Sequence, residues 1–154
     1  MKTIITASII AASLISLAQA ETLSPAAEQA CAAEAAAIKN VKMSEIRTER
    51  AVRWADGTGA VVLKLPGKKD GVCWVSAKGE VEQVVFGTGV EPAQEQACAS
   101  EAAAIKKVRM SAIRAPWSVE GPKGSAWVVL TLKNKKMDCH VSGTAEVLEV
   151  ASYR

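Results

Sequence analysis

Apolar side chains recur every three or four residues in two segments of the chain, which is the spacing of one helix face. The segments cover residues 25–42 and 92–109, and each begins with a proline, a residue favoured in the first turn of a helix. We expect the apolar stripe of each helix to face inward. Its members are Ala27, Cys31, Ala35, Ile38 and Val41 in the first segment and Cys98, Ala102, Ile105 and Val108 in the second.

After each helix the apolar period changes to about two, which indicates strands. Short turns, most of them with glycine, separate the strands, so each strand is expected to pair antiparallel with the next. The pattern therefore predicts an α+β fold of two tandem units, each with one helix packed on a four-stranded antiparallel meander. The predicted strands cover residues 44–55, 60–65, 72–77 and 81–86, and then 111–119, 126–132, 138–142 and 146–151.

The two units follow one pattern. Residues 28–47 read EQACAAEAAAIKNVKMSEIR, and residues 95–114 read EQACASEAAAIKKVRMSAIR. The offset between the copies is 67 residues through the helix and the first two strands, and 66 residues afterwards. Likeness of this extent predicts a duplicated unit, with the first copy in residues 21–87 and the second in residues 88–154. The linker, residues 87–92, is short, so the units are expected to touch.

The first twenty residues have the features of a signal peptide. Lys2 precedes an apolar run over residues 3–18, and Ala18 and Ala20 are the small residues of a cleavage site. We expect cleavage between Ala20 and Glu21 and a periplasmic or secreted product. The alternative is an uncleaved membrane anchor, for which the apolar run is short. No later stretch is apolar enough to span a bilayer, so we expect no stable membrane insertion.

The four cysteines occupy matched positions in the two copies, one in each helix and one in each third strand. Four cysteines in an exported chain indicate two disulfides, and three pairings are possible. The symmetry of the repeat favours Cys31–Cys73 and Cys98–Cys139. Each bond would join the helix to the sheet within its own unit, which a small unit with an alanine- and valine-rich core needs for stability.

Each sheet has a second face, turned away from its helix. If Cys73 faces the helix, its neighbour Trp74 faces the other way, and His140 does the same in the second unit. Trp127 is out of phase with the helix-facing residues of its strand. We take Trp74, Trp127 and His140 as candidate partner-binding residues on an open sheet face. The alternative is that these side chains pack between the two units.

Other chemistry has weaker support. Without Lys2 the chain has 18 basic and 16 acidic residues, an excess too small to indicate a nucleic-acid partner. Met137 and His140 offer soft-metal ligands, but neighbouring strand residues point to opposite faces, so Cys139 and His140 cannot easily share an ion. The chain has one histidine, no C-x-x-C motif and no Gly-x-Ser-x-Gly motif. We therefore expect no cofactor, no metal and no enzymatic activity.

The motifs ACAAEAA in the helix and GVCWVSAKGEVEQVVF over residues 71–86 carry a resemblance. The chain resembles small exported bacterial domains in which a helix cysteine and a strand cysteine beside tryptophan frame a helix-plus-meander unit. In its tandem plan it is similar to β-lactamase inhibitor protein and, more loosely, to PepSY-type periplasmic domains. The resemblance implies an architecture and a bias toward protein binding, and it implies no site residue.

The sequence thus favours an exported, disulfide-stapled protein-binding module, of which an inhibitor is one form. It would recognise a protein partner, unidentified by the sequence, through the open sheet face. The alternative hypothesis is a periplasmic carrier of a small ligand or metal that uses Met137 and His140.

Overall fold

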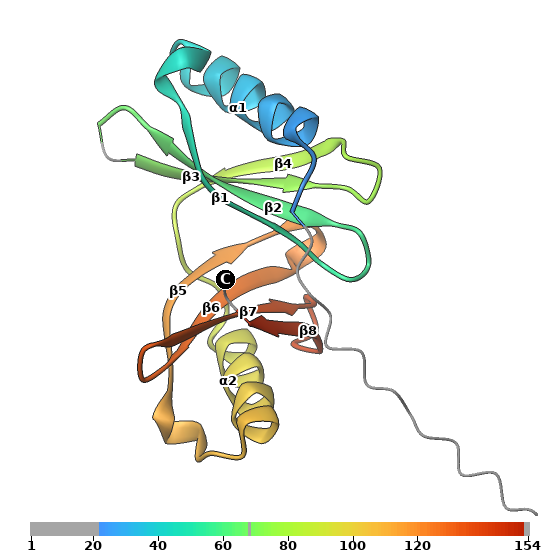
Figure 1. The fold of residues 1–154 in the computed structure, drawn as a ribbon, viewed down its shortest axis with the longest axis vertical. Coiled ribbons are helices and arrows are strands. Elements are labelled where there is room, and N and C mark those ends of the chain that lie inside the picture. Colours follow the sequence, from blue (N-terminus) through green and yellow to red (C-terminus); the bar gives the residue numbers. More distant parts are fainter. Residues whose placement is uncertain (1–21, 68, 153–154) are drawn as a thin grey trace, which may run out of the picture.

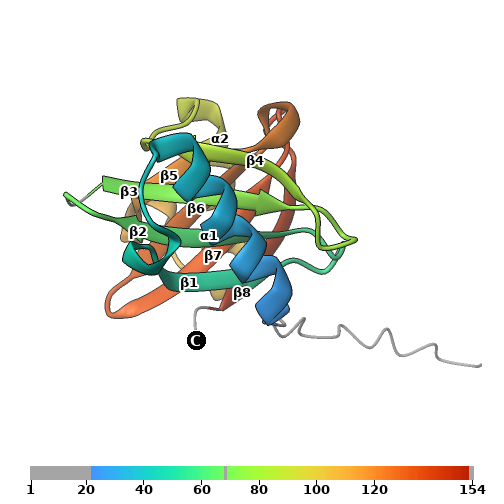
Figure 2. The ribbon, with the colours of Figure 1, turned by 90° about the horizontal axis from the view of Figure 1, so that it is seen from above.

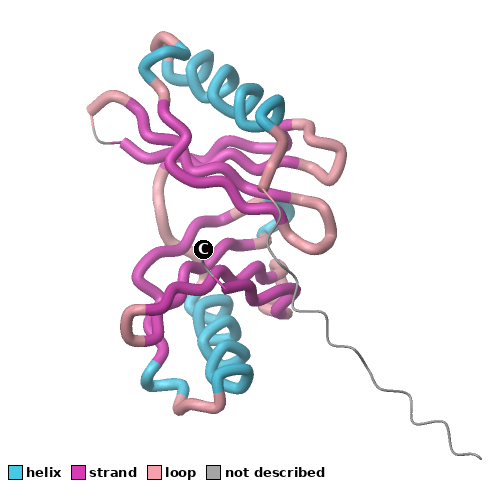
Figure 3. The backbone as a smooth tube through the Cα atoms, in the orientation of Figure 1, coloured by secondary structure: helices cyan, strands magenta, loops and turns pink. Residues whose placement is uncertain are grey.

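The computed structural model describes residues 22–67 and 69–152, and the expected signal peptide lies outside this part of the chain. The first unit contains α1 (Pro25–Lys39), the 3-10 turn η1 (Met43–Glu45), β1 (Arg47–Arg53), β2 (Gly59–Leu65), β3 (Lys69–Val75) and β4 (Val81–Phe86). The second contains α2 (Pro92–Lys106), η2 (Met110–Ala112), β5 (Ile113–Glu120), η3 (Pro122–Gly124), β6 (Ala126–Leu132), β7 (Lys135–Val141) and β8 (Val147–Ser152). Figure 3 shows these helices, strands and loops along the chain.

Each unit has its own antiparallel sheet, with the strands in chain order: β1-β2-β3-β4 and β5-β6-β7-β8. Each helix packs against the sheet of its own unit, so the predicted α+β fold of two helix-plus-meander units is confirmed. The tight turns supply the expected backbone geometry, since Gly57 and Gly79 have φ angles of 87° and 85°. Within the described residues, no helix is long and apolar enough to cross a bilayer.

Both helices end three residues earlier than predicted. The residues that follow them, Asn40 and Lys107, each adopt a left-handed conformation with φ near 53° and end the last turn. The next residues form 3-10 turns, so β1 and β5 also begin later than predicted. Ile38 and Ile105, in the last turn of each helix, are half exposed and not buried as predicted.

The layer between each helix and its sheet is built from small side chains. In the first unit Ala27, Cys31 and Ala35 of α1 pack on Val61 and Leu63 of β2. Such a stripe lets the helix lie close to the sheet, but it buries little apolar area per residue. The second unit repeats this layer with Cys98 and its neighbours.

A disulfide crosses each of these layers. Cys31 is bonded to Cys73 with a Cα–Cα distance of 5.6 Å, and Cys98 to Cys139 with 5.9 Å. This is the pairing that the symmetry of the repeat favours. All four cysteines are fully buried, so each disulfide joins the helix to the middle of its own sheet.

The two units stack through their sheets and form four layers in the order helix, sheet, sheet, helix (Figure 1). The strands of one sheet cross those of the other when the molecule is viewed along its long axis (Figure 2). The linker is bonded to β5 of the second unit, since the Gly89 N–H donates to the Ser118 carbonyl at 2.8 Å. The faces that the sequence analysis treated as open therefore cover each other.

Replacing one cysteine pair by alanine, as in Cys31→Ala/Cys73→Ala, should lower the free energy of unfolding by about 4 kcal/mol, since the lost bond closes a loop of about 42 residues. Urea denaturation followed by tryptophan fluorescence measures this change. The matched variant Cys98→Ala/Cys139→Ala closes a loop of nearly the same length, so its loss should be similar. A change below about 1 kcal/mol in both variants would contradict the stabilising role.

Candidate functional site

The three candidate residues meet inside the molecule. Trp74 is 2% exposed, Trp127 is 0% exposed and His140 is 6% exposed. The expectation that they lie on an open face is wrong, and they pack between the two units. The physical reason is that each sheet has one face without a helix, and the two apolar faces are buried against each other.

Aromatic rings form the centre of this interface. The His140 ring stacks on Trp54 at a centroid distance of 5.0 Å, and Trp74 lies 5.9 Å from it on the other side. Trp127 contacts Trp54 and Trp117 edge-to-face at 6.0 and 5.2 Å. These distances are typical of favourable aromatic pairs.

The Trp74 ring packs directly against the backbone at Gly121. A Cβ atom placed on Gly121 would lie 2.6 Å from Cζ2 of Trp74, so only glycine leaves room for this ring. The indole N–H of Trp74 donates to the Glu120 carbonyl at 3.1 Å, which satisfies its polar atom.

A charged pair crosses the interface beside the rings. Arg50 of β1 binds Asp138 of β7 with two contacts, of which the Nη1–Oδ1 contact measures 2.7 Å. Asp138 also accepts the indole N–H of Trp127 at 2.9 Å and is almost completely buried. The guanidinium carbon of Arg50 lies 5.2 Å from the centre of the Trp127 ring. Asp138 thus has its charge compensated and its oxygens hydrogen-bonded, as a buried carboxylate requires.

The two sheet faces are complementary and not alike. At several equivalent positions of the repeat, a large or charged residue in one unit corresponds to a residue of another type in the other unit. The differing pairs are Arg50/Trp117, Trp54/Gly121, Ala60/Trp127, Val72/Asp138 and Trp74/His140. This explains why the tryptophans are not at matched positions in the two copies, since each face is shaped to fit the other.

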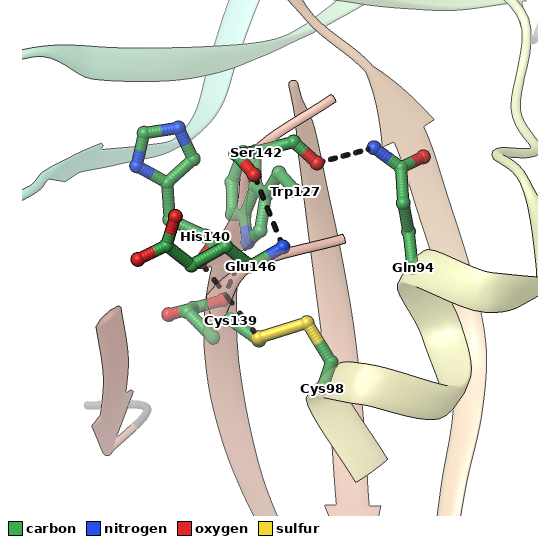
Figure 4. The surroundings of a disulfide bond; sticks show 8 residues. Gln94, Cys98, Trp127, Cys139, His140, Ser142 and Glu146 are labelled. Atoms are coloured by element: carbon green, nitrogen blue, oxygen red, sulfur yellow. Dashed lines mark hydrogen bonds between the residues drawn. A yellow bond between two sulfur atoms is a disulfide. The ribbon is translucent and has the colours of Figure 1, made fainter. Parts of the chain in front are cut away.

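His140 is part of the buried interface, and its surroundings shift its titration. Burial lowers the pKa of this imidazole below its usual value of 6.5, although the charge of Asp56 acts in the opposite direction. Figure 4 shows His140 pointing away from the Cys98–Cys139 disulfide, on the other side of β7. Met137 lies in the helix-facing core, so the predicted pairing of Met137 with His140 as ligands is wrong. Within the described residues, no group of three or more His, Cys, Asp or Glu side chains could hold a metal ion.

The outer surface carries exposed apolar residues, of which the sequence analysis placed Ile38, Ile105 and Val108 on the inward stripes. Ile38 and Ile105 are each 51% exposed, and Met43 and Met110 are each 45% exposed. Val108 is 37% exposed, whereas its equivalent Val41 is half-buried and packs on the core of the first unit. We call these residues the helix-end patches, one in each unit: Ile38, Val41 and Met43 in the first, and Ile105, Val108 and Met110 in the second. Of the six large apolar residues that are exposed in the described part of the chain, five belong to the helix-end patches, and the sixth is Leu148. The signal in the sequence was the near-identity of residues 28–47 and 95–114, which continues past the buried positions.

No family model matches the chain, and no curated protein sequence matches it. Function is therefore argued from the chemistry of its surfaces. Exposed apolar side chains that gather at one place, unlike those scattered singly, are typical of interaction sites.

Replacing Asp138 by alanine should lower the free energy of unfolding by about 3–5 kcal/mol. The change removes the carboxylate that binds the half-buried Arg50 and that accepts the Trp127 N–H. Urea denaturation of the oxidised protein measures the loss.

The matched control is Asp70→Ala, which removes the partner of Lys64 in an exposed pair with an Nζ–Oδ2 distance of 2.7 Å. Its effect should be far smaller, because water screens an exposed pair. Equal losses of stability in Asp138→Ala and Asp70→Ala would mean that the buried interface pair stabilises the fold no more than an exposed pair does. The double variant Arg50→Met/Asp138→Leu should recover much of the stability.

The buried histidine should make the protein less stable in mild acid. The unfolded chain binds a proton near pH 6.5 and the folded chain only at lower pH, so the free energy of unfolding decreases as pH falls through this window. His140→Gln should flatten this part of the pH dependence, measured by urea denaturation between about pH 7.5 and 5.5. Asp56 and Glu149 face the same region and are present in both proteins, so the comparison isolates the imidazole. An unchanged slope in His140→Gln would refute the assignment.

Proposed function

We propose that this chain is an exported protein-binding module, periplasmic or secreted, that recognises its partner through the helix-end patches and not through a sheet face. The observation that carries the proposal is that Ile38 and Met43 are exposed to the same extent as their equivalents Ile105 and Met110. The two disulfides support a location outside the reducing cytoplasm. The resemblance to β-lactamase inhibitor protein adds weight to binding and makes an inhibitory role one form of it.

The pattern of identity between the units supports a role for the patches. Sixteen of the twenty positions in residues 28–47 and 95–114 are identical, although many of these side chains are exposed. At the interface several equivalent positions differ, among them Ala60/Trp127 and Trp74/His140, although Val52/Val119 and Val62/Val129 are alike. Two units with the same fold need similar residues in their cores more than on their surfaces. Identical residues at exposed positions of both units therefore indicate a contact that both units make.

The placement of the patches sets how many partners can bind. α1 and α2 lie at opposite ends of the long axis (Figure 1), and each patch follows the end of one helix. One compact partner cannot reach both ends, so each patch should bind its own copy of the partner. The module would then hold two copies of one protein.

Charge indicates the chemistry of that partner. Lys39, Lys42 and Arg47 surround the first patch, and the side chain of Glu45 is occupied by the Lys42 backbone N–H at 3.0 Å. The second patch has Lys106, Lys107, Arg109 and Arg114, and the nearest acidic residue in the sequence is Glu101, one helical turn before Ile105. A protein surface with apolar side chains inside an acidic rim fits both ends.

The test is capture of partners by tagged, oxidised protein from envelope and secreted extracts of the native organism, followed by the mass of the captured complex. The unaltered protein should hold two copies of the partner. Ile38→Glu and Ile105→Glu should each leave one copy, and the double variant should leave none, because a carboxylate would stand where the acidic partner buries an apolar side chain.

Leu148→Glu is the matched control, since Leu148 is equally exposed but lies outside both patches. It should keep both copies. A partner that stays bound to the double variant, or that is lost equally in the control, would remove the patches from the proposal.

A further inference from the structure

A hollow of about 850 Å³ lies in the second unit, between the end of α2 and the β6–β7 hairpin. Its walls come from Lys106 of α2, from the hairpin residues and from Ser152 at the end of β8. The size lies within the range of small-molecule sites, whereas the hollows at the sheet interface measure only about 240 and 250 Å³.

The first unit shows how this hollow arises. There Phe86 of β4 stands opposite Gly71 of β3, and a Cβ atom on Gly71 would lie 2.9 Å from the Phe86 ring. Lys39 closes the place from outside, with its Nζ 3.9 Å from the centre of that ring. In the second unit the opposing pair is Met137 and Ser152, so the methionine covers the floor and the ring is replaced by a hydroxymethyl group.

Charge changes at the same place. In the first unit Asp70 binds Lys64 at 2.7 Å, but the equivalent residues of the second unit are Lys136 and Thr131. Residues 102–114 and 130–137 together carry seven basic residues and no acidic one, whereas the equivalent segments 35–47 and 63–71 include Glu45 and Asp70. The loss of the ring and the change from Asp70 to Lys136 both concern residues that line the hollow, whereas its lysines Lys106 and Lys135 have lysine counterparts in the first unit.

We propose that this hollow binds an amphiphile with a phosphate or sulfate headgroup. Lys106 and Lys135 would hold the anionic group, and Asn134 offers it an amide donor. Leu132 and Met137 give the apolar part of the ligand a floor, and a methionine adapts to many shapes. The site needs no protein partner, so the inference goes beyond the proposed function.

The test is calorimetric titration of the oxidised full-length mature protein with dodecyl phosphate, kept below its micelle-forming concentration. One dodecyl phosphate should bind per molecule. Ser152→Phe restores the ring that fills the first unit, and Lys135→Glu reverses a charge of the rim, so each variant should weaken binding about tenfold or more. Lys78→Glu, at an exposed lysine of the first unit, is the matched control and should bind like the unaltered protein.

Further titrants separate the sources of the ligand. Binding to phosphatidylglycerol vesicles that is lost in Ser152→Phe would identify a lipid headgroup, and binding to dodecyl phosphate alone would identify a free amphiphile. Equal affinity for dodecyl maltoside would overturn the proposal, because the lysines would then contribute nothing to binding. Equal affinity for inorganic phosphate would also overturn it, because the apolar floor would then contribute nothing.

Persistence of dodecyl phosphate binding in Ser152→Phe would also overturn it. If no titrant binds, but Ser152→Phe releases a captured protein, the hollow belongs to that protein's interface and the ligand proposal fails. The protein-binding function would stand in that case.

Discussion

A sheet that is covered by a helix on one face must bury its other face, and here each of the two sheets does so against the other. This constraint decides most of what distinguishes the units. The interface has to accommodate the Trp54, Trp74 and Trp127 rings, so small residues such as Gly121 stand opposite large ones. It also brings Arg50 to Asp138, which places a hydrogen-bonded charge pair among apolar side chains and gives the contact a defined register.

The same constraint distinguishes the inner sheet faces of the two similar units from their outer ends. The inner faces became unlike because they meet each other, while the outer ends stayed alike where the units make no contact. Ile38 and Ile105 are identical and exposed, whereas Trp74 and His140 are different and buried. Divergence also reached one outer place, where Phe86 of the first unit corresponds to Ser152 of the second and a hollow replaces a filled core.

Much of the fold follows from the sequence, because helix and strand periods and Gly-containing turns are local signals. The helices, the order of the strands and the cysteine pairing were all predictable in this way. The partner of each sheet's second face was not, because alternation separates the two faces of a strand without telling what covers them. The helix ends were misjudged because Asn40 and Lys107 adopt a left-handed conformation without a glycine to announce it. The inward stripe was also extended too far, to Ile38 and Ile105, because the helical period does not tell where the contact with the sheet ends.

The disulfides have a consequence for how the chain matures. Each bond closes within one continuous half of the chain, so the first half contains everything that its own oxidation needs. Cys31 and Cys73 can therefore pair before the second half has emerged from the ribosome or the export machinery. Oxidation can follow chain order, and no correct bond depends on a cysteine that arrives later. A chain that emerges in this direction has little occasion to form a bond that an isomerase must undo.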